Sequence, residues 1–288
     1  MTVIREIQLR SILDCRGKPT VEADIFTEWG FGRAAAPSGA STGLFEAKVK
    51  DPFAAVEHAR QNVIPSLIGE DSRNQVAFDG ILREIDGTGD FATIGANIAV
   101  ALSLANAKAA ASSLDMDLFS YLGGPFVSGM PMPLGNVIGG GAHAEQATEI
   151  QEFLVVPTGA AGMAEAVFAN AHVHRTVKEL LKARGKSCGK GDEGAWAPKI
   201  DDIEAFEIIT EAVSTVSDEL DIPIRIGIDV AASQMWDEAK DAYRFRSGTR
   251  TTEEMVGYIA ELVDQYNLVY VEDPLYEEDF SGFSDLTE

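Results

Sequence analysis

From residue 133 onward, short apolar segments alternate with longer amphipathic ones, and this alternation limits the possible folds of the chain more than any other feature. The helical pattern at 201–220 is the clearest, because Asp201 stands at its N-cap position with Glu204 three residues later. Strands that alternate with helices predict an α/β fold with a mostly parallel sheet, either open or closed into a barrel. The strand-like segments lie at 133–138, 149–157, 224–230 and 268–273.

The segment "IRIGIDV" at 224–230 favours the barrel. Its isoleucines alternate with Arg225, Gly227 and Asp229, so one face of the strand is apolar and the other is small or charged. An open, doubly wound sheet is covered by apolar helices on both faces and would bury the polar face at a cost. The inside of a barrel accommodates such side chains, while the isoleucines pack against the outer helices.

Residues 1–128 show a different pattern, in which strand-like segments come first and helical ones follow. Two strands are expected within 2–31, around the turn "DCRGKPT". The segment "GGPFVSGMPMP" at 123–133 is rich in Gly and Pro, so we place the domain boundary there, between 1–128 and 129–288. Helical patterns lie at 52–69, 72–86 and 94–115, the last of them rich in alanine.

The run "GRAAAPSGASTG" at 32–43 consists almost entirely of small residues. Such side chains cannot build a core, so we expect a mobile loop over 36–45. The hydroxyl groups of Ser38, Ser41 and Thr42 belong to this loop and are able to reach a ligand.

The charge of the chain excludes one class of partner. It has 46 acidic and 23 basic residues and a net charge of −23, whereas nucleic-acid binding needs a basic face. The sequence has no run of 18 apolar residues and no basic-then-apolar N-terminus, so we expect neither a membrane span nor secretion. The two cysteines, Cys15 and Cys188, give no disulfide framework, which favours a reducing cytoplasm.

Two of the predicted strands end in carboxylates, Asp229 on one and Glu272 on the next. Parallel barrel strands end at the same mouth, so both side chains are placed to hold a hard divalent cation such as Mg²⁺. The alternative is that each is a solvated acid at a strand end, which is common.

Glu152 interrupts an apolar strand near its beginning, where a buried carboxylate is costly without a partner or a role. In an all-parallel barrel this is the wrong end, so Glu152 joins Asp229 and Glu272 only if its strand runs antiparallel to theirs. A second acid nearby would raise one pKa and keep a proton available for a leaving group. Glu193 in the turn "GKGDEGAWAP" and His143 after three glycines are either parts of a site or exposed loop residues.

The histidines of "HVH" at 172–174 look like a metal-binding pair, but we interpret them otherwise. They lie within a helical pattern, in which residues two positions apart point in different directions. We therefore do not expect them to bind one ion together.

Six segments, in this order and at fitting distances, resemble the enolase family, and archaeal enolases in particular. The match as a whole extends over essentially all 288 residues. Each segment is weakly specific by itself, whereas six in sequence are strongly specific. They are "SILDCRGKPTVEADI", "APSGASTGLFEA", "NVIGGGAHA…IQEFLVVPTGA", "GDEGAWAP", "IGIDVAAS" and "YVEDPLYEEDF".

This resemblance implies a small α+β domain followed by an eight-stranded barrel whose second strand runs antiparallel, which removes the objection to Glu152. It also implies reversible, Mg²⁺-dependent dehydration of 2-phosphoglycerate to phosphoenolpyruvate, in a homodimer or larger homo-oligomer. Glu22 resembles an acid at the contact between subunits.

Two Mg²⁺ ions are implied, and three residues match their ligands. Asp229 and Glu272 match ligands of the first ion, and Ser41 matches the serine of a lid that reaches the second. Removal of a proton beside a carboxylate concentrates negative charge, which two divalent cations would stabilise.

The resemblance also assigns the acid and two substrate contacts. Glu193, supported by Glu152, matches the acid that protonates the departing 3-hydroxyl group. His143 and Gln151 match positions that contact the substrate.

A longer protein is implied as well. The sequence ends soon after 268–273, which we count as the fifth barrel strand. In the family, the last metal-binding aspartate, the lysine base, a second lysine and an Arg-Ser pair that grips the phosphate would follow. We therefore expect the protein to continue past Glu288, and the 288-residue chain alone to be inactive.

Two alternative functions remain open. Another member of the wider enolase superfamily, such as a sugar-acid dehydratase or racemase, would share the strand-end metal acids. It would not be expected to carry the "PSGASTG" lid or the "GGGAHA" loop. A non-catalytic, enolase-derived protein would instead bind a partner through the exposed edges of an incomplete sheet.

Overall fold

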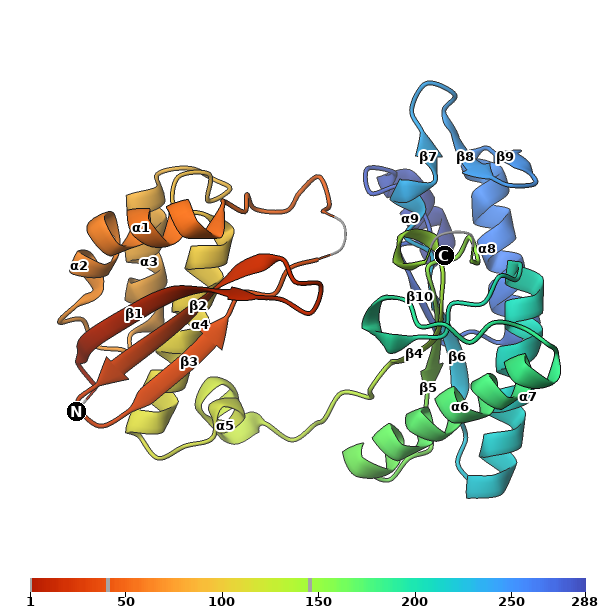
Figure 1. Cartoon of the computed structure of the whole chain (residues 1–288), viewed down its shortest axis with the longest axis horizontal. Helices are drawn as coiled ribbons and strands as arrows, with labels where there is room; N and C mark the ends of the chain where they lie inside the picture. Colours follow the sequence, from red (N-terminus) through yellow and green to blue (C-terminus); the bar gives the residue numbers. More distant parts are fainter. Residues whose placement is uncertain (1, 40–41, 145–146) are drawn as a thin grey trace. The chain divides into compact units, whose positions relative to one another are not determined.

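The computed structural model describes residues 2–39, 42–144 and 147–288. It consists of two units, each with a main sheet and its own helices (Figure 1). The first unit ends at Gly129 and the second begins at Met130, one residue from the boundary expected from the sequence. No helix among the described residues combines the length and the apolar character that a bilayer span requires.

The first unit is built on a three-stranded antiparallel sheet in the order β1-β2-β3. Short turns join the strands, and such connections permit only antiparallel pairing. The strands are β1 (Ile4–Leu13), β2 (Pro19–Thr27) and β3 (Phe31–Ala35). The helices are α1 (Pro52–Asn62), α2 (Ile64–Leu67), α3 (Gln75–Asp86), α4 (Ala96–Ser113) and α5 (Leu118–Gly123), with a 3₁₀ turn, η1, at Gly124–Phe126.

The small residues that begin the run at 32–43 contribute to a core, so the expectation that the whole run stays outside one is wrong. β3 takes up the first of them, and Ala34 and Ala36 are buried in a cluster that α4 also enters. A Cβ on Gly32 would collide with the carbonyl oxygen of Ala105 in α4. The strand and the helix therefore approach closely because these residues are small. The alanine-rich helix predicted at 94–115 is confirmed as α4.

The second unit contains a four-stranded sheet in the order β10-β6-β5-β4, and its strands confirm the four predicted segments. β5 runs antiparallel to both of its neighbours, whereas β6 and β10 are parallel. Residues 140–151 connect β4 to β5, and the two strands pair antiparallel. The strands are β4 (Gly135–Gly139), β5 (Glu152–Val156), β6 (Arg225–Asp229) and β10 (Tyr270–Glu272).

The count of five barrel strands is wrong for the described residues. Between β5 and β6 the chain forms two helices, α6 (Met163–Ala183) and α7 (Asp202–Leu220), and the loop between them adds only an isolated bridge to β4. Both helices pack against the sheet. Asp201 caps α7 as predicted, since its side chain accepts a hydrogen bond from the Glu204 backbone N–H.

The rest of the second unit includes a small sheet that the sequence analysis missed, because its strands are too short to show a period. This sheet joins β7 (Trp236–Asp237), β8 (Ala242–Phe245) and β9 (Gly248–Arg250). The helices α8 (Thr252–Tyr266) and α9 (Phe280–Thr287) follow in the chain. Three 3₁₀ turns, η2 (Gly141–His143), η3 (Asp192–Gly194) and η4 (Ala232–Gln234), lie in the loops.

Aromatic packing joins α7 to the sheet and to α8. The Phe206 ring meets Phe153 of β5 edge-on at 4.9 Å between centroids and stacks on Tyr266 of α8 at 4.0 Å. Phe206 is 1% exposed, so it is a central member of this core.

We expect Phe206→Ala to lower the free energy of unfolding of the second unit by about 3–5 kcal/mol, because it removes a buried ring and leaves a cavity. Urea unfolding followed by the fluorescence of Trp196 and Trp236 measures this change. Phe168→Ala on α6 is the matched control, since Phe168 is 76% exposed and its loss should cost less than about 0.5 kcal/mol. Equal effects of the two substitutions would contradict the assignment of this core.

Candidate functional site

Three acids form a row across the sheet of the second unit. Glu152, the first residue of β5, pairs in register with Asp229, the last residue of β6. Asp229 in turn pairs with Glu272, the last residue of β10. Residues directly opposed on neighbouring strands project from the same face, so the three carboxylates share one edge and one face of the sheet. The antiparallel direction of β5, on which the role of Glu152 depends, is therefore observed.

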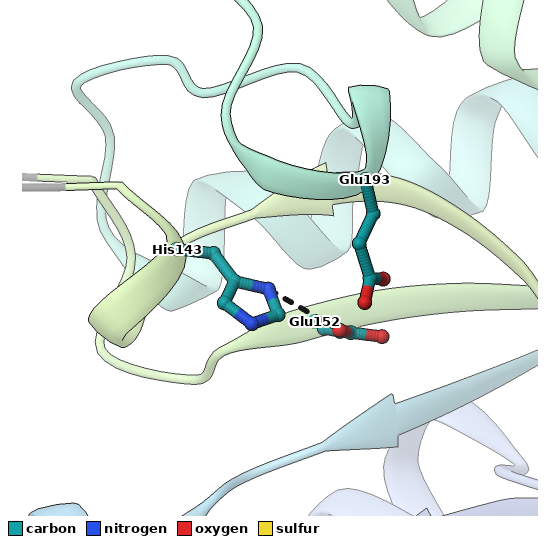
Figure 2. Close-up of side chains that lie close together, drawn as sticks. All are labelled: His143, Glu152 and Glu193. Atoms are coloured by element: carbon teal, nitrogen blue, oxygen red, sulfur yellow. Dashed lines mark ion pairs between the residues drawn. The ribbon is translucent and has the colours of Figure 1, made fainter. Parts of the chain in front are cut away.

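A second group gathers around Glu152. Figure 2 shows the imidazole of His143 and the carboxylate of Glu193 beside it. His143 Nδ1 lies 3.3 Å from Glu152 Oε1, and the side chains of His143 and Glu152 are only 8% and 12% exposed. One potential ligand atom from each of the three residues lies within 4.8 Å of the other two. The loop after β4, the start of β5 and the turn η3 thus converge on one point.

Glycines allow these two loops to approach each other. A Cβ on Gly140 would collide with the Thr148 side chain, and a Cβ on Gly191 would lie 2.8 Å from the carbonyl oxygen of His143. Gly141 has φ +49°, a conformation that favours glycine. The glycines around His143 therefore pack its loop against the β5 entrance and the η3 turn.

Burial, together with the negative charges of Glu193 and Asp229, raises the pKa of Glu152 to about 8. A hydrogen bond with Glu193 also favours the protonated form of Glu152. Glu193 itself is exposed and accepts a hydrogen bond of 3.4 Å from the Asn136 side-chain amide. The Glu152 carboxyl group therefore holds its proton near neutral pH and can donate a hydrogen bond to Glu193.

Asp229 is buried, and its two oxygens have separate partners. The Gln151 side-chain amide donates to Oδ2 at 3.0 Å, and the Ala231 backbone N–H donates to Oδ1 at 2.9 Å. The Gln234 side-chain amide donates a hydrogen bond of 3.1 Å to the side-chain oxygen Oε1 of Gln151, which fixes the orientation of the Gln151 amide. Burial raises the pKa of Asp229 to about 6, against the effect of the Gln151 hydrogen bond, and the charge of Glu272 adds to the rise.

Glu272 is exposed at the end of β10, and its carboxylate accepts a hydrogen bond of 3.0 Å from the hydroxyl of Tyr270. Its position beside Asp229 gives two neighbouring oxygen donors at the ends of parallel strands. Such donors suit a hard divalent cation, which usually takes one or two carboxylates and completes its shell with water and substrate oxygens.

Comparison with known proteins decides the family. Residues 4–122 match the family model of the enolase N-terminal domain, and residues 127–288 match that of the enolase C-terminal TIM barrel domain. The chain belongs to the enolase family. The expected fold class, a small N-terminal α+β domain followed by an enolase-type barrel domain, is confirmed by these matches.

Curated relatives agree with this family. The enolase of Methanocorpusculum labreanum is 63% identical over 289 residues, which cover 100% of this chain and 72% of the relative. The enolase of Natronomonas pharaonis is 54% identical over 291 residues, covering 100% of this chain and 73% of the relative. The enolase of Archaeoglobus fulgidus is 49% identical over 285 residues, which cover 99% of this chain and 71% of the relative.

These enolase matches imply a divalent metal, and the structure offers two acidic groups that could hold one. The cluster of His143, Glu152 and Glu193 is the tighter, but its Glu152 carboxyl group holds a proton, which suits acid chemistry better than metal binding. Asp229 and Glu272 are neighbouring carboxylates whose repulsion a cation would relieve, so this pair fits the metal better. Ser41, the residue expected to reach a second ion, lies outside the described residues.

Two residues that orient parts of the site were not predicted from the sequence. Gln234 orients Gln151, and His174 contacts the backbone of the η3 turn, with Nε2 3.0 Å from the Gly194 oxygen. His172 instead lies 3.2 Å from Glu219, so the two histidines of "HVH" contact different elements. No spacing in the sequence indicates such contacts, because each joins segments distant in the chain.

The pKa of Glu152 predicts a pH-dependent stability. The folded protein holds this proton more tightly than the unfolded chain, so the stability that it provides is present below pH 4.5 and is lost as the pH rises toward 8. In the presence of a metal chelator, the free energy of unfolding of the natural protein should therefore fall by about 2–4 kcal/mol between pH 5 and 9. The Glu152→Gln variant should not show this fall, because an amide does not ionise.

Urea unfolding at a series of pH values measures this fall in the natural protein and in the variant. Glu261→Gln, at an exposed position of α8, is the control and should leave the fall unchanged. Parallel pH profiles for the natural protein and Glu152→Gln would contradict a raised pKa at Glu152.

Proposed function

We propose that this protein catalyses the reversible, Mg²⁺-dependent dehydration of 2-phosphoglycerate to phosphoenolpyruvate. The observation that carries the proposal is the close pair of Glu152 and Glu193 beside the row that ends in Asp229 and Glu272. Dehydration of a 3-hydroxy acid needs a base that takes the C2 proton, an acid for the leaving hydroxyl group and positive charge near the substrate carboxylate. The carboxyl pair would supply the second of these, and the acidic row, by holding Mg²⁺, the third.

Glu193 is the member of the pair that would meet the substrate, because it is exposed, whereas the side chain of Glu152 is only 12% exposed. Glu152 holds the proton when the site is empty and shares it through its hydrogen bond with Glu193. As the C3–O bond breaks, the departing hydroxyl group takes this proton and leaves as water. In the reverse direction the pair accepts the proton from the attacking water.

His143 and Gln151 would contact the substrate from either side of Glu152. The His143 ring is fixed by its closeness to Glu152, and its loop packs against Gly191. The Gln151 amide nitrogen uses one hydrogen for Asp229, which leaves its second hydrogen for a substrate oxygen.

Asp229 and Glu272 would hold the first Mg²⁺ ion, and Ser41 a second. Bound Mg²⁺ would supply the positive charge that stabilises the extra negative charge formed beside the substrate carboxylate. Gln151 and the Ala231 N–H keep the Asp229 carboxylate in one orientation, so it is preorganised for this role.

A homodimer remains part of the proposal. Glu22, which resembles a residue at the subunit contact, here accepts a 2.7 Å hydrogen bond from Arg10 of its own chain. Arg10 and Arg33 also both bind the buried Asp24. This ordered charged network on the first sheet would offer a preformed surface to a second copy.

The proposed metal site predicts a stabilisation that does not depend on activity. In the protein as its natural gene encodes it, Mg²⁺ at 100 times its Kd should add about 2.7 kcal/mol of stability, measured by thermal unfolding after chelator treatment. Asp229→Asn should lose most of this effect, because a neutral amide is a poor ligand for Mg²⁺. Asp218→Asn, at an exposed position of α7, should keep it. Equal stabilisation of the natural protein and Asp229→Asn would contradict the site.

The proposed acid predicts a kinetic effect. Glu193→Gln, in the protein as encoded by its gene, should lower kcat for 2-phosphoglycerate by about 10²–10⁴-fold and change KM only a few-fold, because an amide carries no transferable proton. Absorbance of the phosphoenolpyruvate formed measures the rate, with Glu261→Gln as the control. A normal kcat in Glu193→Gln would exclude Glu193 as the acid. A natural protein that does not turn over 2-phosphoglycerate would instead favour another enzyme of the enolase superfamily or a non-catalytic binding protein.

A further inference from the structure

The turn that presents Glu193 has a backbone conformation that needs support. Glu193 has φ 60° and ψ 3°, in the left-handed region, and Gly194 follows with φ +83°. For a residue with a Cβ this conformation costs about 1–3 kcal/mol, so it persists only where surrounding contacts impose it.

Contacts within the turn provide part of that support. The Gly191 N–H donates to the Ala195 oxygen at 3.0 Å, and the Gly194 N–H reaches back to the Gly191 oxygen at 3.4 Å. The Gly194 carbonyl group is bound from outside, because Nε2 of His174 on α6 lies 3.0 Å from its oxygen. A side chain of another element therefore holds the residue directly after Glu193.

His174 is itself held firmly. Its ring stacks on Trp196 with 4.6 Å between centroids and 27° between planes, and its backbone oxygen accepts a 2.7 Å hydrogen bond from Trp196 Nε1. Trp196 is anchored to β4, since its backbone N–H donates to the Val137 oxygen and its own oxygen accepts from the Gly139 N–H. The contact from His174 to Gly194 thus ties the turn to both α6 and the sheet.

The direction of the hydrogen bond follows from its acceptor. A carbonyl oxygen only accepts, so Nε2 of His174 carries the hydrogen. Burial lowers the pKa of His174, and the nearby Lys190 and Lys178 lower it further, against the effect of the Gly194 bond. The ring is therefore a neutral imidazole with its hydrogen on Nε2.

We propose that His174 is a positioning residue, whose Nε2–H bond to the Gly194 carbonyl oxygen holds the left-handed turn that aims Glu193 at Glu152. Its catalytic consequence rests on the proposed function, in which Glu193 delivers the proton. Without this bond the turn relaxes and the Glu193 carboxylate leaves its place. Binding through Asp229, Glu272 and His143 stays intact, so kcat falls while KM changes little.

Two pairs of variants separate the hydrogen bond from the packing of the ring. His174→Phe keeps a ring against Trp196 but removes the donor. His174→Gln offers an N–H near the position of Nε2, and His174→Met has similar length without a donor. His172→Phe, on the same helix but facing Glu219, is the control.

In the protein as its gene encodes it, we expect His174→Phe and His174→Met to lower kcat about 10-fold or more with KM within two-fold. His174→Gln should recover most of this loss, and His172→Phe should have no effect. A normal kcat in a folded His174→Phe or His174→Met variant would overturn the proposal. Equal losses of kcat in the His174→Gln and His174→Met variants would overturn it too. If His174→Phe does not fold, the Gln and Met pair makes the same comparison.

A second measurement does not depend on activity. Amide hydrogen exchange in the metal-free protein should be at least 10-fold faster at Gly191 and Gly194 in His174→Phe and His174→Met, and close to the natural rate in His174→Gln. Unchanged exchange in the Phe and Met variants would overturn the proposal. A natural kcat in Glu193→Gln would instead exclude the proposed acid, while the exchange rates would still decide whether His174 holds the turn.

Discussion

The reversed direction of β5 is the constraint on which the rest of the site depends. A strand parallel to β6 would place Glu152 at the far end of the sheet from Asp229. β5 instead runs antiparallel to β6, and the register of the two pairs brings Glu152, Asp229 and Glu272 into one row. Loops that follow β4 and α6 add His143 and Glu193 at the same edge. The strand direction and these loops thus bring residues from five separate segments to one sheet edge.

Gathering carboxylates in one row costs free energy, and the structure shows two ways in which that cost is reduced. Around Glu152 and Glu193 the repulsion is relieved by a retained proton, because burial and neighbouring charge raise the pKa of Glu152. Around Asp229 it is relieved only in part, by hydrogen bonds from Gln151 and the backbone. The remaining negative charge there suits a divalent cation. Repulsion between carboxylates therefore has two results at one sheet edge: Glu152 retains a proton and suits acid chemistry, whereas Asp229 keeps negative charge and suits a metal ion.

Small residues and one strained turn place the segments of the fold close to one another and orient Glu193. Glycine lets β3 approach α4 in the first unit and lets the His143 loop approach the η3 turn in the second. Where a side chain is needed in an unfavourable conformation, as at Glu193, a contact from another element holds it. Conformational strain at a residue that must point into a site is a common feature of catalytic loops, and it requires a rigid surrounding.

The sequence by itself determined the α/β alternation, the positions of the four sheet strands, the capping of α7 and the helix α4, because each depends on local periodicity and capping. It also singled out Asp229, Glu272 and Glu152 as unusual acids, since a charge at the end or beginning of an apolar strand needs a reason. Their pairing, the proton held by Glu152 beside Glu193, and the contacts of Gln234 and His174 were decided only by the tertiary structure. Each of these joins residues far apart in the chain, and both burial and repulsion depend on the distances that folding creates.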